Sequence, residues 1–443
     1  MSDSRYRKVP SARLSRLASF GQMAGGIAGG VLAEGARRLA AGERPQLSQL
    51  LLTPANAARV TEQLSRLRGA AMKLGQMISM DAGDLLPAEL TTILARLRDS
   101  AHFMPPAQLN RVLAAELGTD WRRRFARFEA TPLAAASIGQ VHRAQMADGR
   151  VLAVKVQYPG VADSIDADVD NVATLLRLSS LLPASLDIAP LLAEAKRQLH
   201  EEADYCREAE QMRRYHTLLA GDPAFVLPAP VADLSTGRVL AMDFVPGQSI
   251  ETLQEAPAET RDAAMGALLA LVLRELFEFG FMQTDPNFAN YRWQADTGRI
   301  VLLDFGAARA VPAATTAAYR RLMQAGLAED QAALRAALVE VGFVTSTTLE
   351  RHGAALDAMI AVLMAHLGKP GLFDFADRSF VEQVRRHAEG IAADRAAWHI
   401  PPADTLFVQR KVSGTALLAV RMQARLPLRE MVADSIAGTA EPA

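Results

Sequence analysis

The sequence has 443 residues, with 48 Lys and Arg against 49 Asp and Glu, and half of its residues are hydrophobic. This length suggests about two to three domains, and the apolar content excludes a wholly disordered chain. A net charge of −1 gives no reason to expect nucleic acid as a partner. The single cysteine, Cys206, excludes an internal disulfide and a thiolate zinc cluster, which fits a reducing compartment.

Residues 1–45 form a glycine-rich segment with basic flanks, in which glycines recur every four residues from Gly21 to Gly29. Small residues at this spacing let helices approach closely, and basic flanks favour anionic lipid headgroups. We predict that the segment contacts a membrane surface or pairs with another helix, and packing on the protein's own core is the alternative. Asp3 and Glu34 are unusual in a transit peptide. The expected location is therefore the bacterial cytoplasm, peripheral at the inner membrane.

The rest of the chain changes pattern twice. Apolar residues first follow amphipathic helical spacing up to Pro105-Pro106, and short alternating runs around Asp148-Gly149 then predict a β-hairpin. A helical tract over about 161–219 comes next, and the chain after Gly247 is mostly helical, apart from a β-like patch near 288–305. We therefore predict three further domains, namely a helical extension over 46–105, an N-lobe with a helical insertion over 106–247, and a C-lobe over 248–443.

Four separated pieces of sequence carry the chemistry. Lys155 ends the alternating run Val151–Lys155, and an acidic helix is predicted over Glu201–Glu208. Asp285 and Asn290 stand five residues apart, and Asp304 ends a hydrophobic β run before Phe305-Gly306. Taken singly these are weak signals, since such a lysine is usually only the exposed end of a strand.

The order of these pieces matches phosphoryl transfer in the protein-kinase architecture. That architecture needs a strand lysine for the phosphates, a helix acid to orient it, a catalytic Asp, an Asn five residues later for metal, and an Asp-Phe-Gly Asp for Mg²⁺. The step from Asn290 to Asp304 leaves room for a small β-hairpin. We therefore predict an α+β, two-lobed protein-kinase-like fold that binds ATP with Mg²⁺.

Two features depart from ordinary protein kinases. The loop upstream of Lys155 is rich in alanine over Pro132–Val141, where a glycine-rich loop is expected. Alanine avoids the positive φ values that glycine adopts freely, so this loop should bind nucleotide in a stiffer, altered pose. After Gly306 the chain enters a helical pattern without an Ala-Pro-Glu sequence, which leaves no room for a long activation segment that docks peptides.

These motifs resemble the UbiB family of atypical protein-kinase-like proteins, in particular its coenzyme Q (ubiquinone) biosynthesis branch. The resemblance rests on the alanine loop, Lys73-Leu74-Gly75-Gln76, Glu202-Ala203-Asp204, the loop Gln283–Asn287 and Asp304-Phe305-Gly306, and it extends to Arg410-Lys411-Val412-Ser413-Gly414. It implies that Lys155 holds the phosphates with Glu208 as its helix partner, and that Asp285 is the catalytic Asp. It also assigns Asn290 and Asp304 to metal, while the nucleotide loop contains Ala134, Ala135, Ala136 and Ser137.

The resemblance also implies that the helical N-terminal extension lies over the cleft. There Lys73 and Gln76 would face Glu202 and Asp204 and occupy the space of a protein substrate. Helical spacing places Glu202 on a mostly apolar face with Ala195 and Leu199, and a buried carboxylate needs a partner such as Lys73. A solvated lysine and a solvated acidic face are the alternatives.

The implied function is Mg²⁺-dependent ATP binding and slow hydrolysis in support of ubiquinone biosynthesis, with little protein kinase activity in trans. The alternatives are a small-molecule or lipid kinase acting on an isoprenoid or quinone precursor, a conventional protein kinase, and a non-catalytic lipid-binding scaffold. The expected partners are nucleotide, isoprenoid or quinone-precursor lipid and the enzymes of ubiquinone biosynthesis. Contact with a membrane surface and a homodimer stay open.

Overall fold

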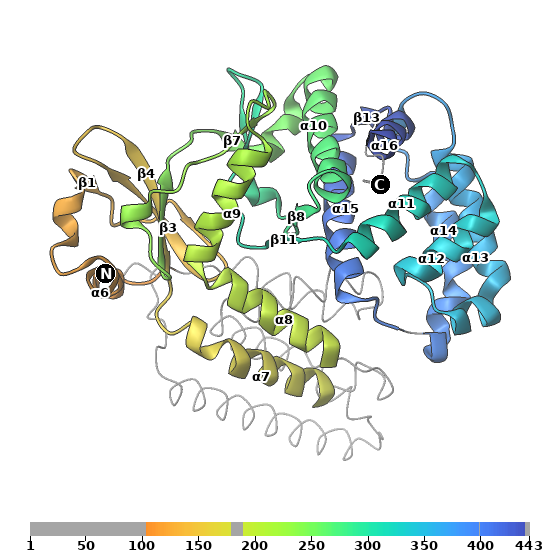
Figure 1. Cartoon of the computed structure of the whole chain (residues 1–443), viewed down its shortest axis with the longest axis horizontal. Helices are drawn as coiled ribbons and strands as arrows, with labels where there is room; N and C mark the ends of the chain where they lie inside the picture. The colour runs from red at the N-terminus through yellow and green to blue at the C-terminus, as the bar shows by residue number, and fades with distance from the viewer. Residues whose placement is uncertain (1–102, 179–188, 398, 439–443) are drawn as a thin grey trace, which may run out of the picture. The chain divides into compact units, whose positions relative to one another are not determined.

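The computed structural model describes residues 103–178, 189–397 and 399–438, and these form two compact units. Described residues of unit 1 run up to Glu210 and from Ala229 to Phe244, and unit 2 comprises Gln211–Pro228 and the chain from Val245. The division falls within one helix, α9 (Tyr205–Leu218) (Figure 1). Lys73, Gln76 and the glycine-rich segment lie outside the described residues. The boundaries of the four expected domains stay predictions.

Unit 1 is built on a five-stranded antiparallel sheet in the order β1-β3-β4-β6, with β2 paired to β3. The strands are β1 (Arg127–Phe128), β2 (Ala134–Ala135), β3 (Gly139–Gln145), β4 (Val151–Gln157) and β6 (Val239–Asp243). β3 and β4 form the predicted hairpin around Asp148-Gly149. Gly149 has φ +89°, a value that glycine adopts at little cost and that makes it the natural residue in this tight turn.

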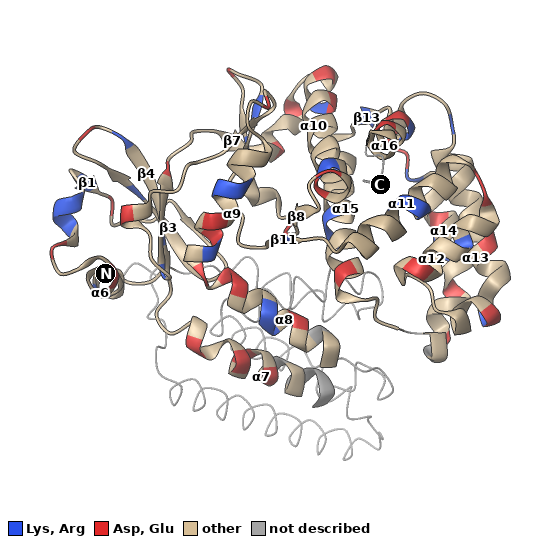
Figure 2. Ribbon diagram, viewed as in Figure 1, with Lys and Arg blue, Asp and Glu red and all other residues tan. Residues whose placement is uncertain are grey.

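The helices of unit 1 are α6 (Pro106–Leu117), α7 (Ile165–Leu178), α8 (Ala189–Glu202) and the start of α9. The prediction of one acidic helix over Glu201–Glu208 is wrong, because α8 ends at Glu202 and α9 begins at Tyr205. Asp204 lies between them, and its Oδ1 accepts hydrogen bonds from the backbone N–H groups of Cys206 at 3.0 Å and Arg207 at 3.1 Å. An Asp in this position caps the first turn of a new helix. Figure 2 shows the acidic residues that α7 and α8 carry.

Unit 2 contains one four-stranded sheet and two short two-stranded sheets, with strand order β5-β10-β9-β7, β11-β8 and β12-β13. The strands are β5 (Phe225–Val226), β7 (Gln248–Ser249), β8 (Phe281–Gln283), β9 (Tyr291–Gln294), β10 (Arg299–Leu302), β11 (Ala308–Ala310), β12 (Phe373–Asp374) and β13 (Arg425–Leu426). β9 and β10 form an antiparallel hairpin, as the spacing between Asn290 and Asp304 predicts.

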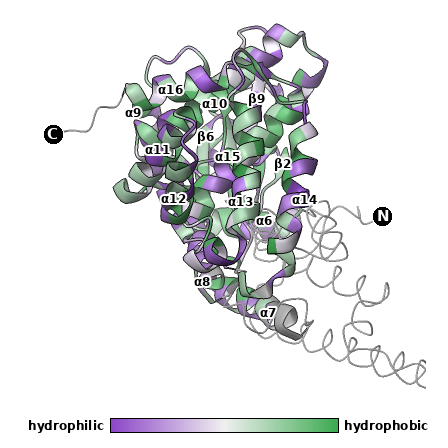
Figure 3. Cartoon of the chain, turned by 90° about the vertical axis from the view of Figure 1, so that its right-hand side faces the viewer, coloured by the Kyte–Doolittle hydropathy of each residue, from purple (hydrophilic) through white to green (hydrophobic). Residues whose placement is uncertain are grey.

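The rest of unit 2 is helical, as predicted. Its helices are the second part of α9, α10 (Ala258–Phe277), α11 (Ala313–Leu327), α12 (Gln331–Val341), α13 (Ser346–Leu367), α14 (Ser379–Ala393), α15 (Ala403–Met422) and α16 (Leu428–Ala437). α10 has an apolar central run, Ala263–Leu273, and packs against α15; Figure 3 colours the helices by hydropathy. Val272, Leu276 and Phe407 are among the buried side chains of this core. Among the described residues, no helix combines the length and hydropathy of a membrane span.

Candidate active site

Lys155 and Glu208 form a buried ion pair in unit 1. Lys155 lies on β4, between β3 and β6, and is 8% exposed, while Glu208 on α9 is fully buried. The Lys155 Nζ atom donates to Glu208 Oε1 at 3.0 Å and to Oε2 at 2.9 Å, and it lies 5.0 Å from the ring centre of Tyr205. Burial of an ammonium group is tolerated when a carboxylate compensates it. Lys155 is therefore not the exposed end of a strand, and the structure brings together the two residues that the family motif pairs.

The alanine loop is a tight hairpin turn between β2 and β3. The backbone N–H of Ala136 donates to the carbonyl of Gly139 at 2.8 Å, and Ala134 and Ala135 pair with β3. Positive φ values occur at two non-glycine residues of the described chain, and neither is in this loop. A Cβ atom on Gly139 would lie 2.5 Å from the Val156 carbonyl oxygen, so the turn closes against β4 only with glycine there. The stiff loop expected from alanine is thus an ordinary hairpin without left-handed residues.

Glu202 and Asp204, the acidic pair of the family motif, differ in their surroundings. Glu202 is 8% exposed, and the Ser137 hydroxyl of the alanine loop donates to its Oε2 at 3.4 Å. Asp204 is exposed and caps α9. The Glu202 carboxylate is therefore tied to the predicted nucleotide loop, whereas Asp204 has a structural use. The contacts expected for Lys73 and Gln76 stay predictions.

The loop that carries Asp285 and Asn290 lies in unit 2 and is closed by its own hydrogen bonds. The side-chain Nδ2 of Asn290 donates to the backbone carbonyl of Asp285 at 3.3 Å. Asn287 Oδ1 accepts from the N–H of Ala289 at 3.1 Å and begins a short 3₁₀ helix over Phe288–Asn290. The amide nitrogen of Asn290 is thus used within the loop. Its side-chain oxygen is the atom that can bind a cation or accept a hydrogen bond.

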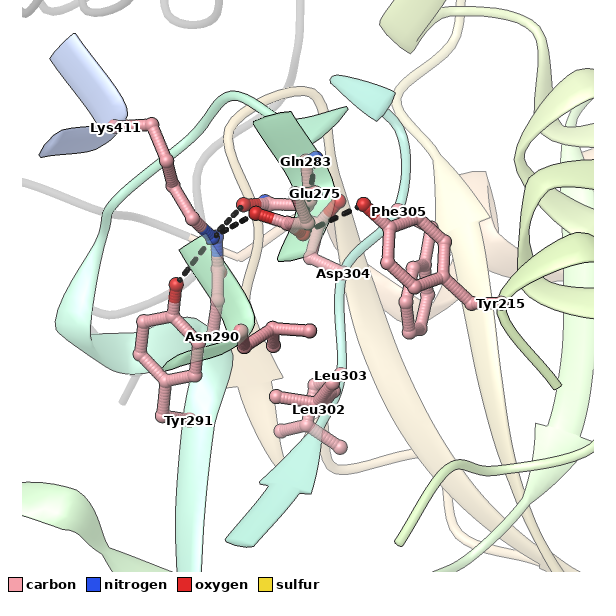
Figure 4. Close-up of a pocket in the computed structure, with 11 residues that line it drawn as sticks. Tyr215, Glu275, Gln283, Asn290, Tyr291, Leu302, Leu303, Asp304, Phe305 and Lys411 are labelled. Atoms are coloured by element: carbon pink, nitrogen blue, oxygen red, sulfur yellow. Dashed lines mark hydrogen bonds and ion pairs between the residues drawn. The ribbon is translucent and has the colours of Figure 1, made fainter. Parts of the chain in front are cut away.

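Asp304 follows β10, and its Oδ1 accepts from the N–H of Gly306 at 2.9 Å. Asp304 and Asn290 line one small cavity of about 10 Å³, shown in Figure 4. Carboxylate and amide oxygens are the ligands that Mg²⁺ prefers, and Mg²⁺ usually takes few of them from protein and the rest from water and phosphate. The donor set therefore fits magnesium.

Sequence reasoning missed a buried polar cluster on the same cavity, which we call the Lys411 cluster. Lys411 Nζ donates to Gln283 Oε1 at 3.2 Å and to the Tyr291 hydroxyl at 3.0 Å, and lies 3.5 Å from Glu275 Oε2 (Figure 4). The Tyr215 hydroxyl donates to Glu275 Oε1 at 2.7 Å. The available signals were Glu275, just after the apolar run Ala263–Leu273 of α10, and Lys411 inside α15, because charges rarely occupy buried helix faces without partners.

Electrostatics keep Lys411 charged. Burial alone would lower its pKa, but the Glu275 carboxylate and the Tyr291 hydroxyl together outweigh this effect and raise the pKa of Lys411 above its usual value. Burial raises the pKa of Glu275, and Lys411 and the Tyr215 hydroxyl partly offset that rise. Burial followed by the Glu275 charge raises the pKa of Tyr215 well above its usual value. The Tyr215 phenol therefore keeps its proton and donates a hydrogen bond to Glu275.

The mixed sheet and helices, the strand lysine paired with a helix Glu, and the Asp-Asn and Asp-Phe-Gly loops define a kinase-like protein. Comparisons with known proteins agree. Residues 96–338 match the family model described as the ABC1 atypical kinase-like domain. The chain belongs to this family of atypical kinases.

Curated relatives match along nearly the whole chain. It is 39% identical to "Atypical kinase COQ8B, mitochondrial" of Rattus norvegicus, with 98% of this chain and 82% of the relative covered. It is 36% identical to "Atypical kinase COQ8, mitochondrial" of Saccharomyces cerevisiae, with 94% and 83% covered. The structure titled as the complex of Rv3197 with erythromycin, from Mycobacterium tuberculosis, is 26% identical, with a TM-score of 0.58 and with 88% of this chain and 97% of that chain covered.

These findings confirm three expectations: the UbiB-type family and its coenzyme Q branch, the two-lobed α+β kinase-like fold class, and the role of an atypical kinase in ubiquinone biosynthesis. The expected bacterial, cytoplasmic location at the inner membrane is wrong. Four curated relatives that match along 94% or more of the chain are named mitochondrial and come from eukaryotes. Two acidic residues in a short segment, Asp3 and Glu34, carried that expectation, and they are a weaker signal than similarity over more than 400 residues.

Proposed function

We propose that this protein binds ATP with Mg²⁺ and hydrolyses it slowly, with little phosphoryl transfer to proteins in trans. The buried Lys155–Glu208 ion pair carries the proposal, with Nζ 2.9 and 3.0 Å from the two carboxylate oxygens. A lysine held this way is charged and oriented, which is what binding of the α- and β-phosphates requires. This ion pair therefore favours an atypical kinase with a working active site over a non-catalytic scaffold.

The proposal assigns each remaining residue a role at one nucleotide. Asn290 and Asp304 would hold Mg²⁺, which neutralises charge on the phosphate oxygens. The Asp285 carboxylate would accept the proton of the attacking water. Ala134, Ala135, Ala136 and Ser137 would cover the phosphates, and the absence of positive φ in that turn supports a constrained nucleotide pose.

A short segment after Asp-Phe-Gly supports weak activity toward proteins. Only residues 307–312 separate Gly306 from α11, which begins at Ala313, and three of them form β11. β11 pairs with β8, so that Ala308 lies opposite Gln283. This segment is too short to present the peptide-docking surface that a long activation loop provides. Water is therefore favoured over a protein hydroxyl as the acceptor.

The cellular output that we propose is support of ubiquinone biosynthesis. Turnover of ATP would either extract an isoprenoid or quinone-precursor lipid from a membrane surface or stabilise an assembly of biosynthetic enzymes. Both routes need the nucleotide site. They differ in whether lipid changes the rate of ATP turnover, as the extraction route requires.

The test is ATP binding and phosphate release with and without Mg²⁺, liposomes and phenolic quinone precursors. We expect Mg²⁺-dependent binding, slow release of free phosphate, and loss of at least tenfold in binding for Asp304→Asn, since one Mg²⁺ ligand oxygen becomes an amide. Asp296→Asn is the matched control, because Asp296 is exposed in the turn between β9 and β10. It should behave as wild type.

Each other outcome counts against the proposal. Nucleotide binding that is absent, or unchanged in Asp304→Asn, would overturn it. Stoichiometric transfer of the γ-phosphate to the quinone precursor would replace hydrolysis with a lipid kinase reaction, and robust labelling of a generic protein would identify a conventional kinase.

A further inference from the structure

Helix α15 contacts the residues on both sides of the proposed catalytic loop, residues 284–290. The loop starts after Gln283, the last residue of β8, and ends before Tyr291, the first residue of β9. Lys411 on α15 donates to both flanking side chains, to Gln283 Oε1 at 3.2 Å and to the Tyr291 hydroxyl at 3.0 Å. One ammonium group thus joins the two ends of the loop that carries Asp285 and Asn290.

A second contact lies three residues further along α15. A Cβ atom on Gly414 would lie 2.2 Å from Cβ and 2.4 Å from Cγ of Pro286, which directly follows Asp285. Only glycine permits this approach, and Pro286 is itself buried. Residues three apart share one helix face, so Lys411 and Gly414 present the same side of α15 to the loop. Proline fixes its own φ and restricts the residue before it. Packing on Pro286 therefore also constrains the backbone of Asp285.

The countercharge anchors the lysine to a third element. Glu275 of α10 lies 3.5 Å from Lys411 Nζ and accepts the backbone N–H of Gln283 at 3.3 Å. The same oxygen, Oε1, also accepts a hydrogen bond from the Tyr215 hydroxyl at 2.7 Å, while Oε2 is the oxygen that faces Lys411. Lys411 is 3% exposed by side chain and Glu275 is fully buried, so water contributes little to holding the ammonium group in place. The ammonium group thus combines hydrogen bonds to an amide oxygen and a phenol oxygen with an ion pair to a carboxylate, and an uncharged Met side chain can make none of these contacts.

We propose that Lys411 and Gly414 are positioning residues that hold the catalytic loop between β8 and β9 in its reactive geometry. This role rests on the function proposed above. Lys411 and Gly414 do not touch the reacting groups themselves, since both act through Gln283, Tyr291 and Pro286. We call the contacts of Lys411 and Gly414 with these three residues the clamp. Loss of the clamp should lower the rate of the chemical step more than the affinity for nucleotide.

Two variants loosen the clamp by different routes. Lys411→Met combined with Glu275→Gln removes both charges, so that no buried ion is left unpaired. Gly414→Ala adds a methyl group that must displace Pro286. Gly390→Ala is the matched control, because Gly390 is also helical, on α14, and a Cβ there meets no atom within 4 Å.

The measurements are amide hydrogen exchange across the chain, without nucleotide, and ATP turnover with Mg²⁺. We expect exchange in 284–290 to rise at least tenfold in both variants, with α10 and α15 unchanged. The kcat should fall about 100-fold, since small misplacement of catalytic groups has effects of this size, while KM for ATP stays within about threefold. The Gly390→Ala control should match wild type in both measurements.

Unchanged exchange in the loop would overturn the clamp, and so would a raised exchange with normal kcat. Exchange that rises equally in α10 and α15 would assign the two residues to folding and overturn the specific role. A wild-type protein that binds no nucleotide would overturn the function proposed above, while the exchange measurement would still decide whether the clamp exists.

Discussion

The two units bury charged and polar groups in different ways. In unit 1, Lys155 projects from a central strand to the carboxylate of Glu208 on a neighbouring helix. His142, on the adjacent strand, is buried without charge. In unit 2, Lys411 joins side chains from α10, β8 and β9 in a single network. Among the described residues, unit 1 thus pairs its buried lysine bidentately with one carboxylate, and unit 2 distributes the contacts of its lysine over several elements.

This difference indicates which of the two buried lysines is suited to contact a ligand. A strand lysine paired with a helix carboxylate is the arrangement with which kinase-like proteins hold phosphates. Lys411 directs its donors to protein atoms on three elements, so its charge serves to hold those elements together. The first arrangement is suited to binding and the second to positioning.

The largest effect should follow from breaking the unit 2 network at its cation. Lys411→Met leaves the fully buried Glu275 carboxylate without its countercharge, and we expect the free energy of unfolding to fall by about 3–5 kcal/mol. Urea denaturation measures it. Lys155→Met should cost less, because the Lys155 side chain is 10% exposed and that of Lys411 is 3% exposed. An equal or larger loss at Lys155 would remove the contrast between the units.

Acid should weaken unit 1 through His142. His142 Nδ1 donates to the carbonyl of Glu129 at 2.9 Å, and Nε2 accepts from the Gln140 side chain at 2.9 Å, so the ring has no acceptor for a second proton. Burial lowers the pKa of His142 from 6.5 to about 4. Because the folded value lies below the unfolded one, this contribution is complete above pH 6.5 and is lost as the pH falls toward 4. The loss should reach about 3 kcal/mol.

Urea denaturation between pH 4 and pH 7 measures this loss. His142→Gln should have lower stability at pH 7 but a flatter dependence over this window, since the two proteins differ only in this side chain. A wild-type slope that the substitution leaves unchanged would show that His142 is not the group responsible.

The smallest effect concerns Asp204, whose capping role contrasts with the predicted role in the cleft. Asp204→Ala removes the acceptor for the N–H groups of Cys206 and Arg207 and should cost about 1 kcal/mol of stability by thermal denaturation. Asn also caps helices well, so Asp204→Asn should stay within a few tenths of a kcal/mol. A fall in ATP turnover for Asp204→Asn, at unchanged stability, would restore a role for its charge in the cleft.

Much of the fold and of the candidate site could be predicted where the signal is local. The hairpin at Asp148-Gly149 follows from alternation and turn chemistry, and the order of Lys155, Asp285, Asn290 and Asp304 follows from a motif. The break at Asp204 was missed because the acidic run matches helical composition, and composition does not reveal that a side chain caps the backbone two residues later.

The family, the kinase-like chemistry and the residue types that can perform it could all be recognised in the amino-acid sequence, since these depend on motifs a few residues long. The burial of Lys155 against Glu208, and the contacts of Lys411, Glu275 and Gly414 with the loop 284–290 and its flanking residues, come from the three-dimensional arrangement. Lys411 and Gln283 are 128 positions apart, and no local pattern encodes such a contact. It arises because apolar packing of α10 against α15 brings these polar groups out of water, where each must find a partner.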